Sequence, residues 1–298
     1  MINAHPSIAI PLETHWIPRW YEERTGLTPE GFVTPGLISS LLEYPKFSRL
    51  GLTRGDLEPL IKSSEPVPYS AFVTGVFNLY GKAQGKPLVG DKTTSYVRSI
   101  RTLHSLWPKA RFIHLIRDGR DVCLSVINWN DKAESLARWF PTWTQDPVST
   151  AAVWWKRNVQ LGREAGQQLG PELYYEMRYE SLVANPLKEC EELCRFLALP
   201  HDTSMLRFHE GQTKSEPGLS AKKAWLPVTS GLRDWRDQMP AEDLERFEAL
   251  AGDLLEELGF PRGISRPEKK VQKHASVIEE IFTQDARSRS GRPLPKDL

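Results

Sequence analysis

The stretch FIHLIRDGRDVCLS, from Phe112 to Ser125, decides the fold of this chain. Its apolar first half is typical of a buried β-strand that ends at Arg117, and a helical pattern follows at once. Asp118 is a suitable N-cap, and Asp121 lies three residues later, as in a capping box. A guanidinium held at a helix N-terminus can bind a phosphate, whereas an ordinary strand-to-helix turn with a surface arginine is the alternative.

A second segment, PLVGDKTTSY over Pro87–Tyr96, has the same arrangement. The pattern predicts a short strand that ends in Gly-Asp-Lys, with Lys92 as the cation. A helix is then predicted over Tyr96–Leu106, and it must end before Pro108. Ligands of open α/β sheets bind at the edge where the strands end. We therefore expect both cations at that edge.

Strands and helices alternate along the chain. Helices are predicted over Ala71–Tyr80, Pro147–Leu161 and Pro186–Leu197, and a strand over Leu173–Tyr179 comes before the last of them. A helix between successive strands is the connection that parallel strands require. The order predicts an α/β fold of doubly wound topology, with a parallel central sheet flanked by helices.

The C-terminal region divides into a core helix and a polar tail. Leucines and a phenylalanine recur on one face of Pro240–Leu258, which predicts an amphipathic helix. From Arg262 onward the chain is polar and basic, so we expect a mobile tail with a short helix around Val271–Phe282. The predicted organisation is one domain over 1–261 and a tail over 262–298.

These segments resemble the sulfotransferase family that uses 3′-phosphoadenosine 5′-phosphosulfate, above all its bacterial members and the protein-tyrosine sulfotransferases. The resemblance implies a P-loop-NTPase-like sulfotransferase fold that binds a nucleotide. It matches Arg117 and Ser125 to the pair that holds the 3′-phosphate of the cofactor, and Lys92 to the lysine that neutralises the transferring sulfuryl group. Tyr179, in the segment MRYESL, matches the tyrosine that contacts adenine.

The start of the chain extends the resemblance. Ala4-His5-Pro6 and the segment LETHWIPR match a family turn that is followed by a glutamate, which is the general base in tyrosine sulfotransferases. Glu13 occupies that place. His15 stands where an arginine is usual, and we expect it to face the acceptor. Trp16 either lines the acceptor cleft with Trp20 or packs in the core.

Asp91 is a second acid near the expected chemistry, since it precedes Lys92 and some carbohydrate sulfotransferases carry an acid there. We rank it below Glu13 as the base and expect it to orient Lys92 or to cap the next helix. Ser220, seven residues before Pro227, resembles the serine of the family's closing loop, which helps to stabilise the transferring group.

The Gly-rich phosphosulfate loop, Arg-Ser-Gly-Thr-Thr, normally lies just upstream of the Ala-His-Pro turn. Here the residues before that turn are Met1-Ile2-Asn3, so the first strand and the loop are not found. A start codon assigned too late would explain this, and so would a loss that leaves a non-catalytic relative. Arg289-Ser290-Gly291 has no strand before it, and we interpret it as tail.

Length and composition fit one cytoplasmic α/β domain. The chain has 298 residues, 40% of them hydrophobic, and a net charge of +1, which argues against broad attraction to nucleic acid or membranes. We expect Cys123, Cys190 and Cys194 to be buried thiols. No stretch is long and apolar enough to predict a transmembrane span.

The resemblance therefore implies a transferase that moves a sulfuryl group from 3′-phosphoadenosine 5′-phosphosulfate to a hydroxyl, without a metal. Phenol, sugar, lipid and peptide hydroxyls all remain open as acceptors, and so does the oligomeric state. A catalytically inactive nucleotide-binding or interaction protein of the same fold is one alternative. A kinase-like phosphotransferase is another, but it would need a lysine-bearing Gly-rich loop and a magnesium-binding acid, and neither is visible.

Overall fold

The structure is a computed structural model that describes residues 1–298 except 63, 129–139, 141, 211–225, 230–232 and 289–298. The chain forms two compact units. Unit 1 consists of Met1–Phe112 and Pro186–Val228, and unit 2 of Ile113–Asn185 and Thr229–Leu298. Each unit has its own hydrophobic core.

Unit 1 is built on a short parallel strand pair. Strand β1 (Ile8–Ala9) pairs with β2 (Leu88–Val89), with Ile8 opposite Leu88. Its helices are α1 (Ile17–Glu22), α2 (Pro35–Glu43), α3 (Arg54–Leu57), α4 (Tyr69–Ala83), α5 (Ile100–Leu106) and α10 (Pro186–Leu197). The described part of this unit also contains short 3₁₀ helices: η1 (Ile2–Ala4), η2 (Phe47–Leu50), η3 (Glu58–Ile61), η4 (Thr94–Ser99) and η6 (Thr203–Met205).

The core of unit 1 forms where helices of strong apolar periodicity meet. Helix α4 buries Phe72, Val73, Val76 and Phe77, whose spacing of three and four residues defines one face. These side chains pack in one cluster with leucines of α2 and with Trp16. Burying a side chain of this size contributes roughly 1.5 to 3 kcal/mol, so the cluster holds the loop that follows β1 in place.

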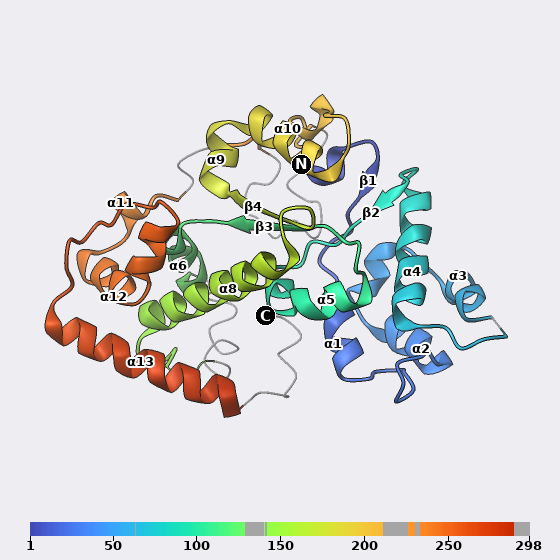
Figure 1. Cartoon of the computed structure of the whole chain (residues 1–298), viewed down its shortest axis with the longest axis horizontal. Coiled ribbons are helices and arrows are strands. Elements are labelled where there is room, and N and C mark those ends of the chain that lie inside the picture. Colours follow the sequence, from blue (N-terminus) through green and yellow to red (C-terminus); the bar gives the residue numbers. More distant parts are fainter. Residues whose placement is uncertain (63, 129–139, 141, 211–225, 230–232, 289–298) are drawn as a thin grey trace. The chain divides into compact units, whose positions relative to one another are not determined.

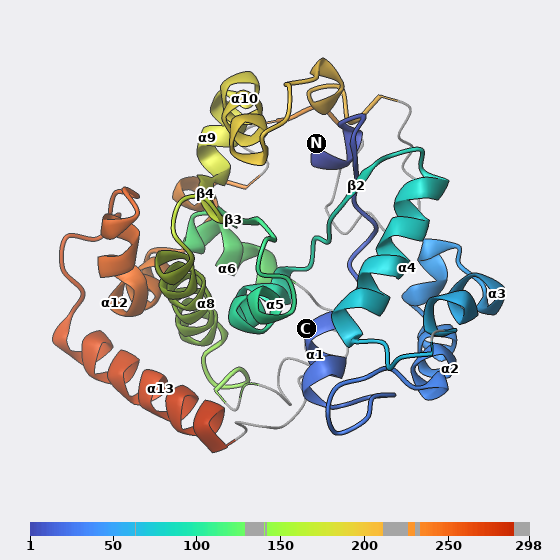
Figure 2. The same cartoon turned by 45° about the vertical axis from the view of Figure 1, so that its right-hand side comes forward.

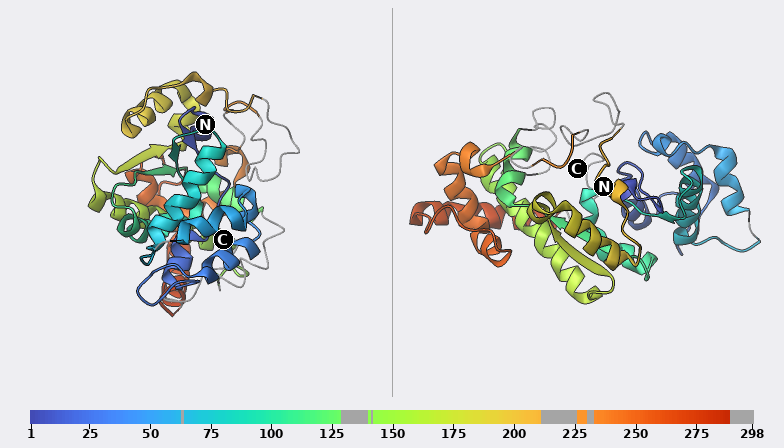
Figure 3. Two further views of the ribbon diagram at one scale, coloured as in Figure 1. Left: turned by 90° about the vertical axis from the view of Figure 1, so that its right-hand side faces the viewer. Right: turned by 90° about the horizontal axis from the view of Figure 1, so that it is seen from above.

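Unit 2 contains the other strand pair and the longest helices. Strand β3 (Phe112–Ile116), which begins at the unit boundary, pairs with β4 (Tyr174–Arg178). The helices are α6 (Gly119–Ile127), α8 (Pro147–Leu169), α9 (Tyr179–Ala184), α11 (Trp235–Gln238), α12 (Ala241–Glu257) and α13 (Lys269–Ser288). Helix α8 packs against α6, α12 and α13, and Figures 2 and 3 show α12 beside α8 from further directions.

The fold class is α/β, as the alternation of patterns predicts. Helix α10 has the predicted bounds, and β4 lies within the predicted strand. The predicted helix over Tyr96–Leu106 begins as the 3₁₀ turn η4 before α5. The described strands form two two-stranded sheets, whereas a single central sheet was predicted.

A helix is present around Val271–Phe282, as predicted, but α13 is longer than the short helix expected there. Ala275, Ile278 and Phe282 of this helix are buried in the core of unit 2. Their side chains repeat every three to four residues, so the helix presents one apolar face to α8 and α12. The polar composition of the segment reflects its other face.

The three cysteines are buried free thiols, as predicted. Within the described ranges, no helix combines the length and the apolar character that crossing a bilayer requires.

Candidate active site

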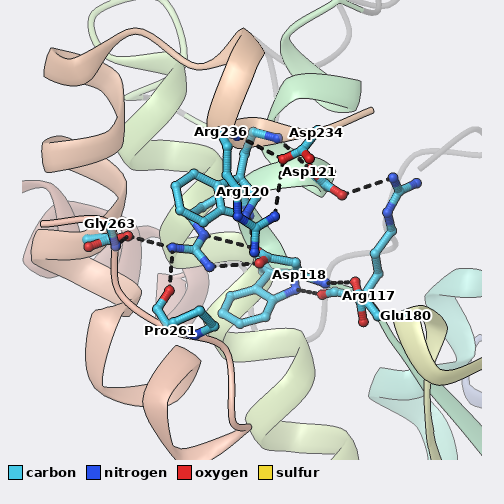
Figure 4. A network of polar contacts seen from close by, with 12 residues as sticks. Arg117, Asp118, Arg120, Asp121, Glu180, Asp234, Arg236, Pro261 and Gly263 are labelled. Carbon is cyan, nitrogen blue, oxygen red and sulfur yellow. Dashed lines mark hydrogen bonds and ion pairs between the residues drawn. The ribbon is translucent and has the colours of Figure 1, made fainter. Parts of the chain in front are cut away.

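The turn from β3 to α6 has the cap that the sequence predicts. Asp118 accepts a hydrogen bond from the backbone N–H of Arg120, at 3.0 Å. The predicted capping box is wrong, because the backbone N–H of Asp118 donates to Glu180 Oε1 at 2.9 Å (Figure 4). Asp121 instead accepts the N–H of Trp235 at 3.0 Å. Partners distant in sequence thus replace the local one.

Arg117 is held at the start of this turn with part of its guanidinium unpaired. Its Nη2 donates to Asp121 Oδ2 at 3.1 Å, and the guanidinium carbon lies 4.5 Å from the ring centroid of Tyr179. Its Nε is buried and has no hydrogen-bond partner among the described residues. A buried cationic N–H without an acceptor is costly, so an incoming phosphate oxygen would be favoured here.

Ser125 belongs to the same helix face as Asp121, since the two are four residues apart on α6. Tyr179 is the first residue of α9, directly after β4. The structure therefore brings Arg117 and Tyr179 into contact and places Ser125 one turn beyond the residue that pairs with Arg117.

A buried charge cluster supports the turn. Arg120 has no exposed surface, and it forms ion pairs with Asp118 at 2.7 Å and with Glu248 at 2.6 Å. It also donates to the carbonyl of Pro261 and lies over the ring of Trp235 (Figure 4). Charged groups this buried require partners of this kind.

Packing fixes the same turn from the side of α8. Trp155 Nε1 donates to the backbone carbonyl of Arg117 at 3.1 Å. At Gly119 a β-carbon would lie 2.5 Å from the Trp155 ring and 2.7 Å from Phe247, so only glycine fits. Glu180, Glu248 and Trp155 are supports that the sequence analysis missed, because they lie far along the chain from the turn.

In unit 1 the parallel pairing of β1 and β2 brings two strand ends together. Glu13, after β1, accepts a hydrogen bond from Lys92 Nζ, after β2, at 2.6 Å. Its other carboxylate oxygen lies 3.2 Å from Nε2 of His15. Burial alone would raise the pKa of Glu13, but the hydrogen bonds from His15 and Lys92 outweigh it and lower the pKa to about 2.

Asp91 is bonded to hydroxyl groups. Thr14 Oγ1 donates to one of its oxygens and Thr93 Oγ1 to the other, while Tyr96 OH lies 2.8 Å from Thr14 Oγ1. Burial raises the pKa of Asp91 to about 6 in spite of these bonds. Thr14 belongs to the segment that carries Glu13, so its hydrogen bond to Asp91 connects that segment to the loop after β2. No local pattern in the sequence indicates this hydroxyl network.

The remaining predicted residues have different outcomes. Trp16 has no exposed surface and packs edge-on against Phe47 and Tyr69, so core packing accounts for it. His5, in the Ala-His-Pro turn, lies 2.9 Å from the carbonyl of Pro200. Ser220 lies outside the described residues. Across the described ranges, no three His, Cys, Asp or Glu side chains cluster as metal ligands.

Comparison with known proteins gives a consistent result. The model of the family described as "Sulfotransferase family" matches residues 1–203. Protein-tyrosine sulfotransferase 1 of Danio rerio is 24% identical over 303 residues, which cover 94% of this chain and 74% of that protein. The human protein of the same name is 24% identical, with 91% and 69% covered.

Solved structures are similar as well. The sulfotransferase domain from the curacin biosynthetic pathway superposes with a TM-score of 0.49 at 18% identity. The match covers 92% of this chain and 89% of that one.

Proposed function

Because the chain belongs to the sulfotransferase family, we propose that it transfers the sulfuryl group of 3′-phosphoadenosine 5′-phosphosulfate to a hydroxyl of a small molecule or peptide. The observation that carries the proposal is the Glu13–Lys92 pair, at 2.6 Å, formed by two strand ends. It supplies a carboxylate and a cation side by side. The family match favours sulfuryl over phosphoryl transfer.

Unit 2 carries the residues that we assign to the nucleotide. Arg117 and Ser125 would hold the 3′-phosphate, and Tyr179 would contact adenine. The Nε of Arg117 is buried and has no hydrogen-bond partner in the described part of the chain, which supports this role because a phosphate oxygen would satisfy it. The Tyr179 ring restricts the guanidinium on one face, so the donor geometry is fixed before the nucleotide arrives.

Unit 1 carries the residues that we assign to the chemistry. When bound, the phosphosulfate supplies an activated sulfuryl group whose departure leaves negative charge on a phosphate oxygen. Lys92 would meet that charge, as cations do in related phosphoryl transfer. The Glu13 site would provide the general base for the acceptor hydroxyl, with Asp91 as a positioning residue. Ser220 would assist the transferring group.

Nucleotide binding tests the first assignment. Calorimetry should show that adenosine 3′,5′-bisphosphate binds more tightly than AMP, because only the former carries the phosphate that Arg117 recognises. Arg117→Ala should reduce this preference roughly 10- to 150-fold, the value of a charged hydrogen bond. Arg236→Ala is the matched control, since Arg236 is exposed and pairs with Asp234. Equal affinities for the two nucleotides would contradict the assignment.

Turnover measurements test the assignment of Glu13 and Lys92 to the chemistry. Transfer of labelled sulfate by the full-length protein would be measured on phenols, sugars and peptides, with tyrosine peptides first because the curated relatives are tyrosine sulfotransferases. Glu13→Gln should lower turnover about 10²- to 10⁴-fold with nucleotide affinity unchanged. Lys92→Ala should lower turnover and also weaken donor binding. Loss of turnover in Asp91→Asn but not in Glu13→Gln would show that the base is misassigned.

A further inference from the structure

We infer that His15 and Glu13 form a dyad in which the imidazole accepts the proton of the acceptor hydroxyl and the carboxylate orients the ring. The inference rests on the proposed function and names the base within that same site. His15 is two residues from Glu13, and its side chain is 11% exposed. Most of the His15 side chain is therefore buried, and part of its surface remains exposed.

The hydrogen bonds assign a role to each ring nitrogen. Glu13 has a partner on both carboxylate oxygens, Lys92 on Oε1 and His15 Nε2 on Oε2. An ionised carboxylate only accepts hydrogen bonds, so Nε2 of the neutral imidazole is the nitrogen that carries hydrogen. Nδ1 is then the basic nitrogen. Within the described part of the chain, the hydrogen bond to Glu13 is the one formed by this ring.

The carboxylate alone is a weak base. Its two cationic or N–H partners hold the pKa of Glu13 at about 2, far from the pH at which a general base is most effective. An imidazole is suited to proton transfer near neutral pH. A carboxylate beside it fixes the tautomer and stabilises the imidazolium that forms, as in hydrolase triads.

The backbone at His15 is held in an uncommon conformation. Its φ is +61°, in the left-handed region, which a residue with a β-carbon occupies at a cost of about 1 to 3 kcal/mol. Thr14, the residue before it, is fixed by hydrogen bonds to Thr93 Oγ1 and to Asp91. Such outliers persist where the surrounding contacts determine them, often at functional sites.

Among the described residues, the charged and titratable groups linked to the ring are Glu13, Lys92 through Glu13, and Asp91 through its charge. The hydroxyl of Tyr96 contacts Thr14, the residue before His15. The charge of His15 lowers the pKa of Asp91, against the larger effect of burial. A pH dependence of the reaction thus has two candidate sources, His15 and Asp91, which the test must separate.

The O–H bond of the acceptor breaks and its proton bonds to Nδ1 of His15, while the oxygen lone pair forms the new O–S bond. The bond between sulfur and the bridging phosphate oxygen breaks, and its electron pair stays on the 5′-phosphate. Lys92 meets that charge, and the imidazolium beside Glu13 later releases its proton to water.

The key variant is His15→Asn. Asparagine tolerates a positive φ and keeps an N–H that can donate to Glu13, but it cannot accept a proton near neutral pH. Turnover should fall about 10²- to 10⁴-fold with nucleotide affinity unchanged. Adding imidazole to His15→Gly should restore activity, because glycine fits the backbone and leaves room for the ring. Wild-type turnover in His15→Asn would overturn the inference.

The pH profile separates His15 from Asp91. Wild-type turnover should decline as the pH falls, because an imidazole that already holds a proton cannot accept one from the acceptor hydroxyl. Asp91→Asn should retain this decline, whereas the residual turnover of His15→Asn should lose it. A decline that disappears in Asp91→Asn and persists in His15→Asn would assign the titration to Asp91 and overturn the inference.

Nitrogen-15 NMR of the histidine ring gives a readout that does not depend on activity. We expect the tautomer with hydrogen on Nε2 at pH 8, and its loss in Glu13→Gln. Hydrogen on Nδ1 would overturn the inference whatever the turnover. If the tautomer is as expected but no acceptor receives sulfate, the proposed function fails and the base role fails with it. If sulfate is transferred equally by His15→Asn, only the dyad fails.

Discussion

At the scale of single residues, the pKa values of two neighbouring carboxyl groups are shifted in opposite directions by their surroundings. Glu13 faces a lysine and a histidine, and its pKa is lowered to about 2. Asp91 faces hydroxyls, which stabilise a negative charge less than cations do, so burial prevails and raises its pKa to about 6. Groups with opposed shifts in one site are suited to different roles.

The raised pKa of Asp91 predicts a pH-dependent cost in stability. Between its usual value of 3.8 and about 6, the folded protein holds a proton that the unfolded chain has lost. Stability from this group is therefore greatest below pH 3.8 and declines as the pH rises toward 6. The free energy of unfolding of Asp91→Asn, relative to that of wild type, should therefore increase by on the order of 2 kcal/mol when the pH is raised from 4 to 7.

Urea unfolding at the two pH values measures this gain. The quantity of interest is the difference between variant and wild type at each pH, because the titration of all other groups then cancels. A difference that is the same at pH 4 and pH 7 would show that Asp91 is ionised at no cost in the folded protein.

The pairing of Glu13 with Lys92 could be anticipated, because each follows a strand end and the resemblance matched both to one chemistry. The contact between Glu13 and His15 could not. It depends on the left-handed conformation of His15, which the hydroxyl network around Asp91 supports. Backbone propensity alone would favour an extended conformation at His15. In an extended chain the side chains of residues 13 and 15 point to the same side, but nothing brings them into contact.

At the scale of elements, the β3–α6 turn depends on one buried arginine. Arg120 forms ion pairs with both Asp118 and Glu248, which are nearly or fully buried. Arg120→Met should lower the free energy of unfolding by about 3 to 5 kcal/mol, because it leaves two buried carboxylates uncompensated. Thermal and urea unfolding measure the loss.

Arg236→Ala provides the control for this variant. Arg236 is exposed and forms an ion pair at 3.2 Å with Asp234, so its removal should change stability by less than about 1 kcal/mol. Similar losses in the two variants would mean that the buried cluster contributes no more than a surface pair.

Helices were the most predictable elements. A proline at the first turn and an apolar face both identify a helix from the local sequence. Helix α10 begins at Pro186 and ends at Leu197, as the pattern indicates. The capping box failed because the N–H groups of Asp118 and Trp235 found partners on other elements. A local motif can show which groups need a partner, but tertiary packing decides which partner they receive.

At the scale of the whole molecule, the sequence predicted the α/β class but not the division into two compact units. Alternation of strands and helices is a local signal, whereas the units join segments far apart in the chain. Unit 2, for example, combines Ile113–Asn185 with Thr229–Leu298. The length and the docking of α13 were not predicted for the same reason, because its average composition conceals a narrow apolar face.

Helix α13 offers a matched test of how the core of unit 2 is completed. Ile278 and Ile281 lie three residues apart on this helix, but Ile278 is 2% exposed and Ile281 is 38% exposed. Ile278→Ala should lower the free energy of unfolding by about 2 to 5 kcal/mol, since it removes buried apolar surface and leaves a cavity beside α8 and α12. Ile281→Ala makes the same chemical change and should cost less than about 1 kcal/mol, because its side chain already contacts water. Urea unfolding measures both values. Equal losses would show that α13 does not dock through the face described, and that the core of unit 2 closes without it.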